Sequence, residues 1–224
     1  MKKSHQKIYT NSGNEDVINL ITGTNLKILD VGCGSGSVAE KLNRIGCVVD
    51  GITLSEIELD TAKRYLRKGY IFNLENGLPE SISENEYDYV ICSHVLEHIA
   101  FPDNLLKAIK KVLKKDAKLI VALPNVFYYK ARFQLLKGSF KQEESGIWDY
   151  THLRWYSFKT AAYLLEQYDF SIEQASVTGD LPAASLFRII LNDRIRKKLF
   201  SILAKTSEGL WGYQLLYSAR NLKS

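Results

Sequence analysis

The sequence predicts an α/β fold built on a doubly wound, mostly parallel sheet. Short apolar runs alternate with amphipathic segments along most of the chain, which is the pattern of βαβ units. The first apolar run, residues 27–31, ends in a turn that holds three glycines within residues 32–36. A helical pattern follows that turn directly, and a strand, a glycine-rich turn and a helix in this order are typical of nucleotide-binding α/β domains.

The remaining elements follow from hydrophobic spacing and from turn residues. Apolar residues of the fourth helical segment, such as Leu105, Leu106 and Ile109, recur at helical spacing, and Pro124 ends the strand that comes next. Strands are predicted at residues 27–31, 47–53, 70–73, 87–92, 118–123, 170–177 and 213–219. Helices are predicted at residues 38–45, 56–67, 105–113, 158–168 and 186–203.

The length and composition fit one domain. Of the 224 residues, 46% are hydrophobic and 25% are charged, which is enough apolar material for a sizeable core. We expect a core at residues 14–125, a lid at 126–157, and the final helices and strands at 158–224. The net charge is +5, and a solvated surface is its simplest explanation, so no nucleic-acid partner is expected.

The cysteines and the N-terminus bear on the compartment. Cys33, Cys47 and Cys92 are odd in number and lack zinc-ligand spacing, so free thiols in a reducing compartment are expected. Residues 1–10 are polar and lack the apolar region of a secretory signal, and no apolar run approaches the ~18 residues that span a bilayer. We therefore expect a cytoplasmic protein.

The glycine-rich turn is the main chemical signal. Glycine lets the backbone approach a ligand closely, and a helix N-terminus offers backbone N–H groups to an anion. A dinucleotide site has the spacing G-x-G-x-x-G, whereas this chain has G-x-G-x-G with Ser37 at the last glycine position. The spacing argues against NAD, and an ordinary tight turn remains an alternative.

The turn and its context resemble class I S-adenosylmethionine-dependent methyltransferases. Residues 28–36 resemble the first motif of that family, and residues 49–55, 87–92, 95–99 and 119–125 resemble the segments that follow it, so the likeness covers roughly residues 14–178. It implies a Rossmann-like, seven-stranded sheet with an antiparallel last strand and a helical, aromatic lid. The residues that it implies for binding S-adenosylmethionine are Asp30, Gly32, Cys33, Gly34, Gly36, Thr53, Leu54, Asn73, Leu74, Ser93 and His94.

Two of these positions depart from the family pattern. The family usually has an acid at the end of the second strand, where a carboxylate accepts from the ribose hydroxyls, but this chain has Thr53. Its Thr-Leu-Ser sequence resembles the cyclopropane-synthase branch, and whether Asp50 compensates is open. Asn73 stands where the family often has an aspartate, and an amide carbonyl can accept the same hydrogen bond from adenine.

One segment also matches a metal motif. His94-Val95-Leu96-Glu97-His98 fits H-x-x-E-H, the inverted zinc-protease pattern. The match directly follows a strand, and no downstream acid is evidently placed as a third ligand. We therefore expect no metal, and we take His98 as a structural residue or as a second catalytic candidate.

The lid supplies the candidate acceptor residues. Residues 146–157 resemble the Asp-x-Thr-His-Leu-Arg segment of methyltransferases associated with bacterial surface polysaccharides, and a related pattern occurs in methionine-biosynthesis W-type proteins. His152 is the first candidate for the base that removes an acceptor proton, because histidine suits that step near neutral pH. Arg154, which either clamps an acidic acceptor or pairs with Asp149, joins Asn125 and Tyr156 as substrate-binding candidates. An aromatic loop that only packs on the sheet remains the alternative.

The function expected from these features is methyl transfer from S-adenosylmethionine to a small polar acceptor, most simply an oxygen of a small molecule or sugar. The alternatives are a cofactor-binding partner protein without turnover of its own and an NAD-dependent oxidoreductase. The helix at 186–203 carries Phe187, Leu191, Ile195, Leu199 and Ile202 on one face. We expect this stripe to pack on the domain, with peripheral contact to an anionic membrane as the alternative.

Overall fold

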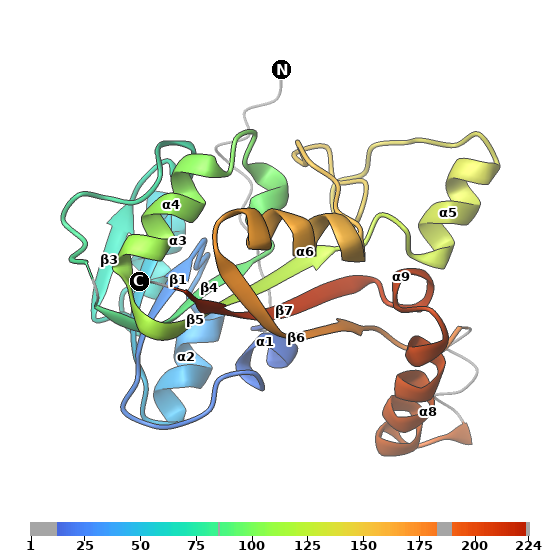
Figure 1. Cartoon of the computed structure of the whole chain (residues 1–224), viewed down its shortest axis with the longest axis horizontal. Helices are drawn as coiled ribbons and strands as arrows, with labels where there is room; N and C mark the ends of the chain where they lie inside the picture. Colours follow the sequence, from blue (N-terminus) through green and yellow to red (C-terminus); the bar gives the residue numbers. More distant parts are fainter. Residues whose placement is uncertain (1–12, 85, 183–189, 223–224) are drawn as a thin grey trace.

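A computed structural model of the chain describes residues 13–84, 86–182 and 190–222. It contains one sheet of seven strands in the order β3-β2-β1-β4-β5-β7-β6 (Figure 1). β7 runs antiparallel to both of its neighbours, and the other pairings are parallel. The predicted doubly wound sheet with an antiparallel last strand is therefore confirmed. The strands are β1 (Lys27–Val31), β2 (Val48–Thr53), β3 (Lys68–Ile71), β4 (Tyr87–Ser93), β5 (Leu113–Pro124), β6 (Phe170–Thr178) and β7 (Gln214–Asn221).

Helices cover both faces of the sheet (Figure 1). Alternate side chains of a strand point to opposite faces, so Leu29 and Val31 join one apolar cluster and Ile28 joins the other. The first cluster includes residues of α4 and α6, and the second includes residues of α1 and α2. The helices are α1 (Glu15–Ile18), α2 (Ser37–Arg44), α3 (Glu56–Ala62), α4 (Asp103–Val112), α5 (Tyr129–Leu136), α6 (Phe158–Gln167), α8 (Asp193–Thr206) and α9 (Glu208–Trp211), with 3-10 turns η2 (Leu74–Asn76) and η3 (Leu96–His98).

The strand order reverses between β1 and β4. β1 pairs with β2 on one side and with β4 on the other. β2 and β3 therefore extend the sheet in one direction, and β4 and β5 extend it in the other. Open α/β sheets bind their ligands at the carboxyl ends of the strands beside such a switch point. The predicted cofactor residues Asp30, Thr53 and Ser93 lie at or next to the carboxyl ends of β1, β2 and β4.

Two predicted boundaries are wrong for one shared reason. The predicted helix at 56–67 ends at Ala62, and the predicted strand at 70–73 begins at Lys68. The backbone N–H of Arg67 already donates to the Val49 carbonyl (2.8 Å), and Lys68 pairs with Asp50 in the sheet. The chain leaves the helix early because it must enter the sheet in register with β2.

The prediction for the apolar stripe of residues 186–203 is also wrong where the structure describes it. The first residues of the predicted helix, Phe187 among them, fall within 183–189 and so lie outside the described residues. The observed helix α8 begins only at Asp193. Ile195, Leu199 and Ile202 are 43%, 41% and 57% exposed. The face that packs is carried instead by Phe200, whose ring lies against Gly179. Among the described helices, none is long and apolar enough to cross a membrane.

This packing predicts opposite outcomes for two substitutions in α8. Phe200→Ala should lower the free energy of unfolding by about 3 kcal/mol, because it removes a buried ring and leaves a cavity. Ile195→Ala should lower it by less than about 1 kcal/mol, because the side chain is already partly in water. Urea unfolding of both variants measures the difference. Equal losses would show that the sequence-based stripe is buried after all.

Candidate functional site

The glycine-rich turn after β1 is held by its neighbours. The N–H groups of Gly32 and Cys33 both donate to the Ile52 carbonyl (2.9 Å each), which ties the turn to β2. Gly32 has a φ of 78°, and a Cβ there would lie 2.5 Å from a methyl group of Val95. Only glycine satisfies both conditions. The turn therefore packs against the chain that leaves β4 and brings the ends of β1 and β4 together.

Asp30 is a buried carboxyl group at this junction. Its side chain is 2% exposed, and Oδ2 has no hydrogen-bond partner among the residues that the structure describes. Burial raises the pKa of Asp30 to about 7, because the charged form loses its hydration. An unpaired buried carboxyl oxygen is costly, and a cationic ligand at the strand end would relieve that cost.

The end of β2 carries a carboxylate that the sequence analysis missed. Thr53 Oγ1 donates to Glu58 Oε2 (2.6 Å), and both side chains are buried. Glu58 lies in the first turn of α3, where its N–H donates to the side chain of Ser55 (3.3 Å). The S-x-x-E spacing of a helix start was the available signal. The acid absent from the strand end is thus present five residues later, at the same place in the fold.

Asp50 does not fill that role. Its carboxylate accepts from Arg67 Nε (2.8 Å) and from the Tyr87 hydroxyl (2.7 Å), and it is 1% exposed. The backbone N–H of Lys68 donates to it as well (3.1 Å). Asp50 therefore joins β2 to β3 and β4, and its oxygens are occupied within the protein.

The other predicted residues of the second and third strands lie at the same edge of the sheet. Leu54 follows β2 and is 54% exposed. Asn73 follows β3, and its Oδ1 accepts from the Glu75 N–H (3.1 Å), which caps the turn that Leu74 begins. An amide oxygen has a second lone pair, so this capping bond leaves Asn73 able to accept another hydrogen bond.

His94 is held between two acceptors. It has a φ of 57° just after β4, its Nε2 lies 2.8 Å from Gln214 Oε1, and its Nδ1 lies 3.1 Å from Glu97 Oε1. Burial opposes the charged ring, but the hydrogen bond and charge of Glu97, with the bond to Gln214, raise the pKa of His94 overall. Asn14 completes the network by donating to Gln214 (2.8 Å) and to Ser93 (3.2 Å).

The lid segment is docked on η3. The carbonyl of Glu97 accepts from the N–H groups of Leu153 (2.8 Å) and Arg154 (3.0 Å). The guanidinium of Arg154 donates from Nε to the Ala100 carbonyl (2.7 Å). Three hydrogen bonds thus fix residues 153–154 against the segment that follows β4, and this brings the predicted lid histidine next to η3.

His98 and His152 form a pair at this contact. Their rings meet edge to face, with centroids 4.8 Å apart. His152 Nδ1 lies 3.1 Å from the Ile147 carbonyl, and His98 Nδ1 lies 3.2 Å from the Thr151 carbonyl. A carbonyl only accepts, so each Nδ1 carries a proton, and in the neutral ring of His152 the lone pair lies on Nε2. Burial lowers the pKa of His152, which favours this neutral form.

Glu97 completes the group and was not predicted. Its side chain is 1% exposed, and Oε2 has no hydrogen-bond partner among the described residues. Glu97, His98 and His152 each offer one ligand atom, and these three atoms lie within 4.8 Å of one another. The structure therefore joins His98 and Glu97 of the H-x-x-E-H segment with a histidine from the lid, while His94 turns toward Gln214.

Two predicted substrate-binding residues have structural uses instead. Asn125 is fully buried, and its amide donates to the carbonyls of Gly212 (2.7 Å) and Gly209 (3.1 Å) while its oxygen accepts from the Phe127 N–H (3.0 Å). Tyr156 belongs to the apolar core.

Arg154 keeps its place at the site. In the described part of the chain it forms no ion pair with Asp149, whose carboxylate accepts from the N–H (2.9 Å) and the hydroxyl (2.7 Å) of Thr151. The structural alternative for Arg154 is thus not the one observed, and it is the only one of the three substrate-binding candidates that stays partly exposed at the lid contact.

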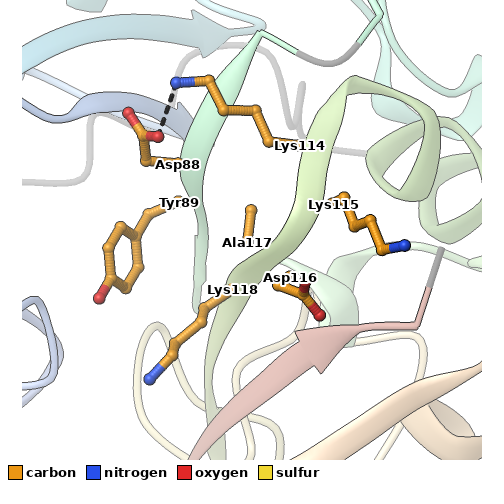
Figure 2. A pocket seen from close by; sticks show the side chains of 7 residues that line it. All are labelled: Asp88, Tyr89, Lys114, Lys115, Asp116, Ala117 and Lys118. Carbon is orange, nitrogen blue, oxygen red and sulfur yellow. Dashed lines mark hydrogen bonds and ion pairs between the residues drawn. The ribbon is translucent and has the colours of Figure 1, made fainter.

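A cavity of about 200 Å³ lies at a different part of the sheet. Figure 2 shows the side chains that line it. It is lined by Asp88 and Tyr89 at the start of β4 and by residues 114–118 of β5, with Lys114 paired to Asp88 (2.6 Å). These residues stand at the amino end of β4, opposite the edge that carries the turn and the histidine pair. This cavity is therefore not part of the candidate site.

The chain is similar to known proteins. The ubiquinone biosynthesis O-methyltransferase of Bartonella tribocorum is 30% identical over 115 residues, which is 50% of this chain and 47% of that protein. The enzyme of the same name from Shewanella sp. (strain ANA-3) is 35% identical over 92 residues, or 39% of each chain. The chain thus spans about half the length, or less, of these curated relatives.

The fold also matches solved structures. An S-adenosylmethionine-dependent methyltransferase from Mesorhizobium loti superposes with a TM-score of 0.62 at 19% identity, over 92% of this chain and 96% of that one. A model of the methyltransferase domain family matches residues 9–175. Because that match covers well over half of the 224 residues, the resemblance seen in the sequence is confirmed, and the chain belongs to the methyltransferase domain family.

Proposed function

We propose that this protein transfers a methyl group from S-adenosylmethionine to an oxygen atom of a small-molecule acceptor. The observation that carries the proposal is the pair of His98 and His152, whose rings meet edge to face just after β4 and whose Nδ1 atoms are held by backbone carbonyls. The two curated relatives described above are named O-methyltransferases, which supports oxygen as the methylated atom. An oxygen acceptor must lose a proton during the reaction, and the histidine pair provides for that step.

The residues at the switch point fit the cofactor. S-adenosylmethionine supplies an activated methyl group on a positively charged sulfur and also carries an ammonium group. Asp30 offers a buried oxygen without a partner to that positive charge. Gly32 lets the turn pack closely against Val95, which sets the end of β1 beside the segment that follows β4. Glu58, beside Thr53, offers the carboxylate that a ribose diol requires.

The lid side fits the acceptor. His152, and His98 after it, assist removal of the acceptor proton, while the backbone bonds from Leu153 and Arg154 to Glu97 hold the lid in place. Positioning is the main contribution of the protein, because the methyl group is already activated and moves by in-line displacement. The partly exposed guanidinium of Arg154 suits an acidic or polar acceptor.

Loss of the lid histidine should slow turnover without loosening the cofactor. We expect His152→Gln to lower the rate of S-adenosylhomocysteine formation with a hydroxylated acceptor at least about 100-fold, because proton transfer loses its partner. The dissociation constant for S-adenosylmethionine should stay within about twofold, since His152 faces the acceptor side. Leu153→Ala, at an exposed neighbour, is the control. Cofactor binding without any methylated product in the wild type would favour a partner protein that lacks turnover.

Asp30 predicts a pH dependence of cofactor binding. With a pKa of about 7, the group is mostly neutral at pH 6 and mostly charged at pH 8. The charged form attracts the cationic cofactor, so its affinity should rise about tenfold between those pH values. Calorimetry at both pH values measures this, and Asp30→Asn should abolish the dependence while Asp60→Asn keeps it. Equal wild-type affinities at the two pH values would contradict the assignment.

The raised pKa of Asp30 also predicts how the stability of the cofactor-free protein depends on pH. Folding raises the pKa of Asp30 from 3.8 to about 7. The contribution of the protonated group to the free energy of unfolding is therefore fully present below pH 3.8 and is lost as pH rises through 7. Asp30→Asn should therefore stabilise the cofactor-free protein at pH 8, by up to about 4 kcal/mol. Unfolding in urea at pH 8 checks this, and a destabilised variant would argue against an unpaired, buried charge.

If the carboxylate of Glu58 holds the ribose of the cofactor, a carboxylate at position 53 should be able to replace it. Glu58→Gln should weaken S-adenosylmethionine binding by about 10- to 100-fold, the usual effect of losing a charged hydrogen-bond acceptor. The double variant Thr53→Asp with Glu58→Gln should restore much of it, because the carboxylate returns to the strand end. Glu56→Gln, at an exposed acid in the same helical turn, serves as the control. Unchanged affinity in folded Glu58→Gln would remove Glu58 from the cofactor site.

A further inference from the structure

We propose that Glu97, His98 and His152 bind one divalent metal ion of the zinc class. The proposal rests on the proposed function, because the ion would stand where the acceptor oxygen loses its proton. One ligand atom from each residue lies within 4.8 Å of the other two. Ligands about 2.1 Å from a zinc ion lie roughly 3.4 Å apart in tetrahedral geometry, so shifts of about 1 Å or less bring these atoms into range.

Each ligand is already oriented by a partner of its own. The Nδ1–H groups of His152 and His98 donate to the carbonyls of Ile147 and Thr151, which leaves Nε2 as the ligand atom of both rings. Oε1 of Glu97 accepts from His94, which leaves Oε2. Metal-binding histidines and carboxylates have such outer partners as a rule, because the partners fix the tautomer and the direction of the lone pair.

The burial of Glu97 points to a missing cation. Its side chain is 1% exposed, and Oε2 is buried without a hydrogen-bond partner among the residues that the structure describes. A carboxylate oxygen in that state is costly, and a bound metal removes the cost. Two imidazoles and one carboxylate are the donor set of many catalytic zinc sites, which keep one position open for a substrate oxygen. Two nitrogen donors disfavour magnesium, which prefers oxygen.

The third ligand explains why the sequence favoured no metal. That expectation rested on the lack of a downstream acid near the H-x-x-E-H segment, and the structure supplies a histidine instead. His152 comes from the lid, and the bonds from Leu153 and Arg154 to the Glu97 carbonyl bring it into place. The set is therefore Glu97, His98 and His152, and not the His94 and His98 pair that the motif suggests.

A bound ion would account for the loss of the proton from the acceptor hydroxyl. The acceptor hydroxyl binds at the open position, and the positive charge lowers the pKa of that hydroxyl, so its proton leaves to solvent. The oxygen lone pair then forms the new O–CH₃ bond, and the electron pair of the broken S–CH₃ bond stays on sulfur, which becomes neutral. With Nε2 bound to the ion, His98 and His152 do not take the proton themselves; they hold the ion that lowers the pKa of the hydroxyl.

The test uses the full chain, stripped with a chelator and titrated with zinc alone by calorimetry, with no cofactor or acceptor present. We expect one zinc ion per chain. His152→Gln and Glu97→Gln should each weaken binding by at least about 100-fold, as expected for loss of a ligand. His94→Gln should weaken it less than either ligand variant does, by about 10- to 100-fold, as expected for an outer partner. Cobalt(II) in place of zinc should give a visible spectrum of a nitrogen-ligated ion that His152→Gln abolishes.

Three results would overturn the site: no binding by the stripped wild type, binding that all three variants retain, or binding that His94→Gln abolishes and His152→Gln keeps. Unchanged circular dichroism in each variant excludes misfolding. Failure here is separable from failure of the proposed function. Methyl transfer by a metal-free, chelator-insensitive enzyme would overturn the metal site alone, and zinc binding without methyl transfer to any oxygen would overturn the function alone.

Discussion

Two buried carboxyl oxygens, which have no hydrogen-bond partner within the described ranges, lie at the edge of the sheet that carries the candidate site. Asp30 Oδ2 lies near the end of β1 and Glu97 Oε2 in the turn after β4, the two central strands where the sheet reverses its winding. An unsatisfied buried acceptor costs about 1–3 kcal/mol, and more when it is charged. The surrounding core, in which Leu29, Val90 and Leu96 are fully buried, holds both groups in place despite that cost. In the proposed function, both strand ends offer negative charge to positively charged ligands.

Most of the fold could be predicted because its signals are local. Apolar runs and helical spacing identified all seven strands, and the glycine-rich turn marked the end of β1. The failures come from tertiary contacts. The helix α3 stops at Ala62 because Arg67 must pair with Asp50 and enter the sheet, which no local pattern shows. The apolar stripe of α8 looked like a core face, but Gly179 offers its surface to Phe200 on another side of the helix.

The candidate site could be predicted only where one segment carries the signal. His98 and His152 became candidates because each lies in a motif, and Asp30 because it precedes the glycines. Which atoms meet in space was not visible from the sequence. Glu58 was overlooked because the usual acid was sought at the strand end, and Asn125 was misplaced because its hydrogen bonds go to carbonyls more than 80 residues away in sequence.

Glu97 connects the parts of the site through three of its atoms. Its carbonyl accepts two N–H groups of the lid, its Oε1 holds His94, and its Oε2 is the unpartnered oxygen beside the histidine pair. A lid that opened would break the bonds from Leu153 and Arg154 and would carry His152 away from His98. Because the same residue anchors the lid and, in the proposed function, faces the reacting group, closing the acceptor site would also assemble its chemistry. A short 3-10 turn suits this task, since it exposes a carbonyl that a continuing α-helix would use for its own hydrogen bonds.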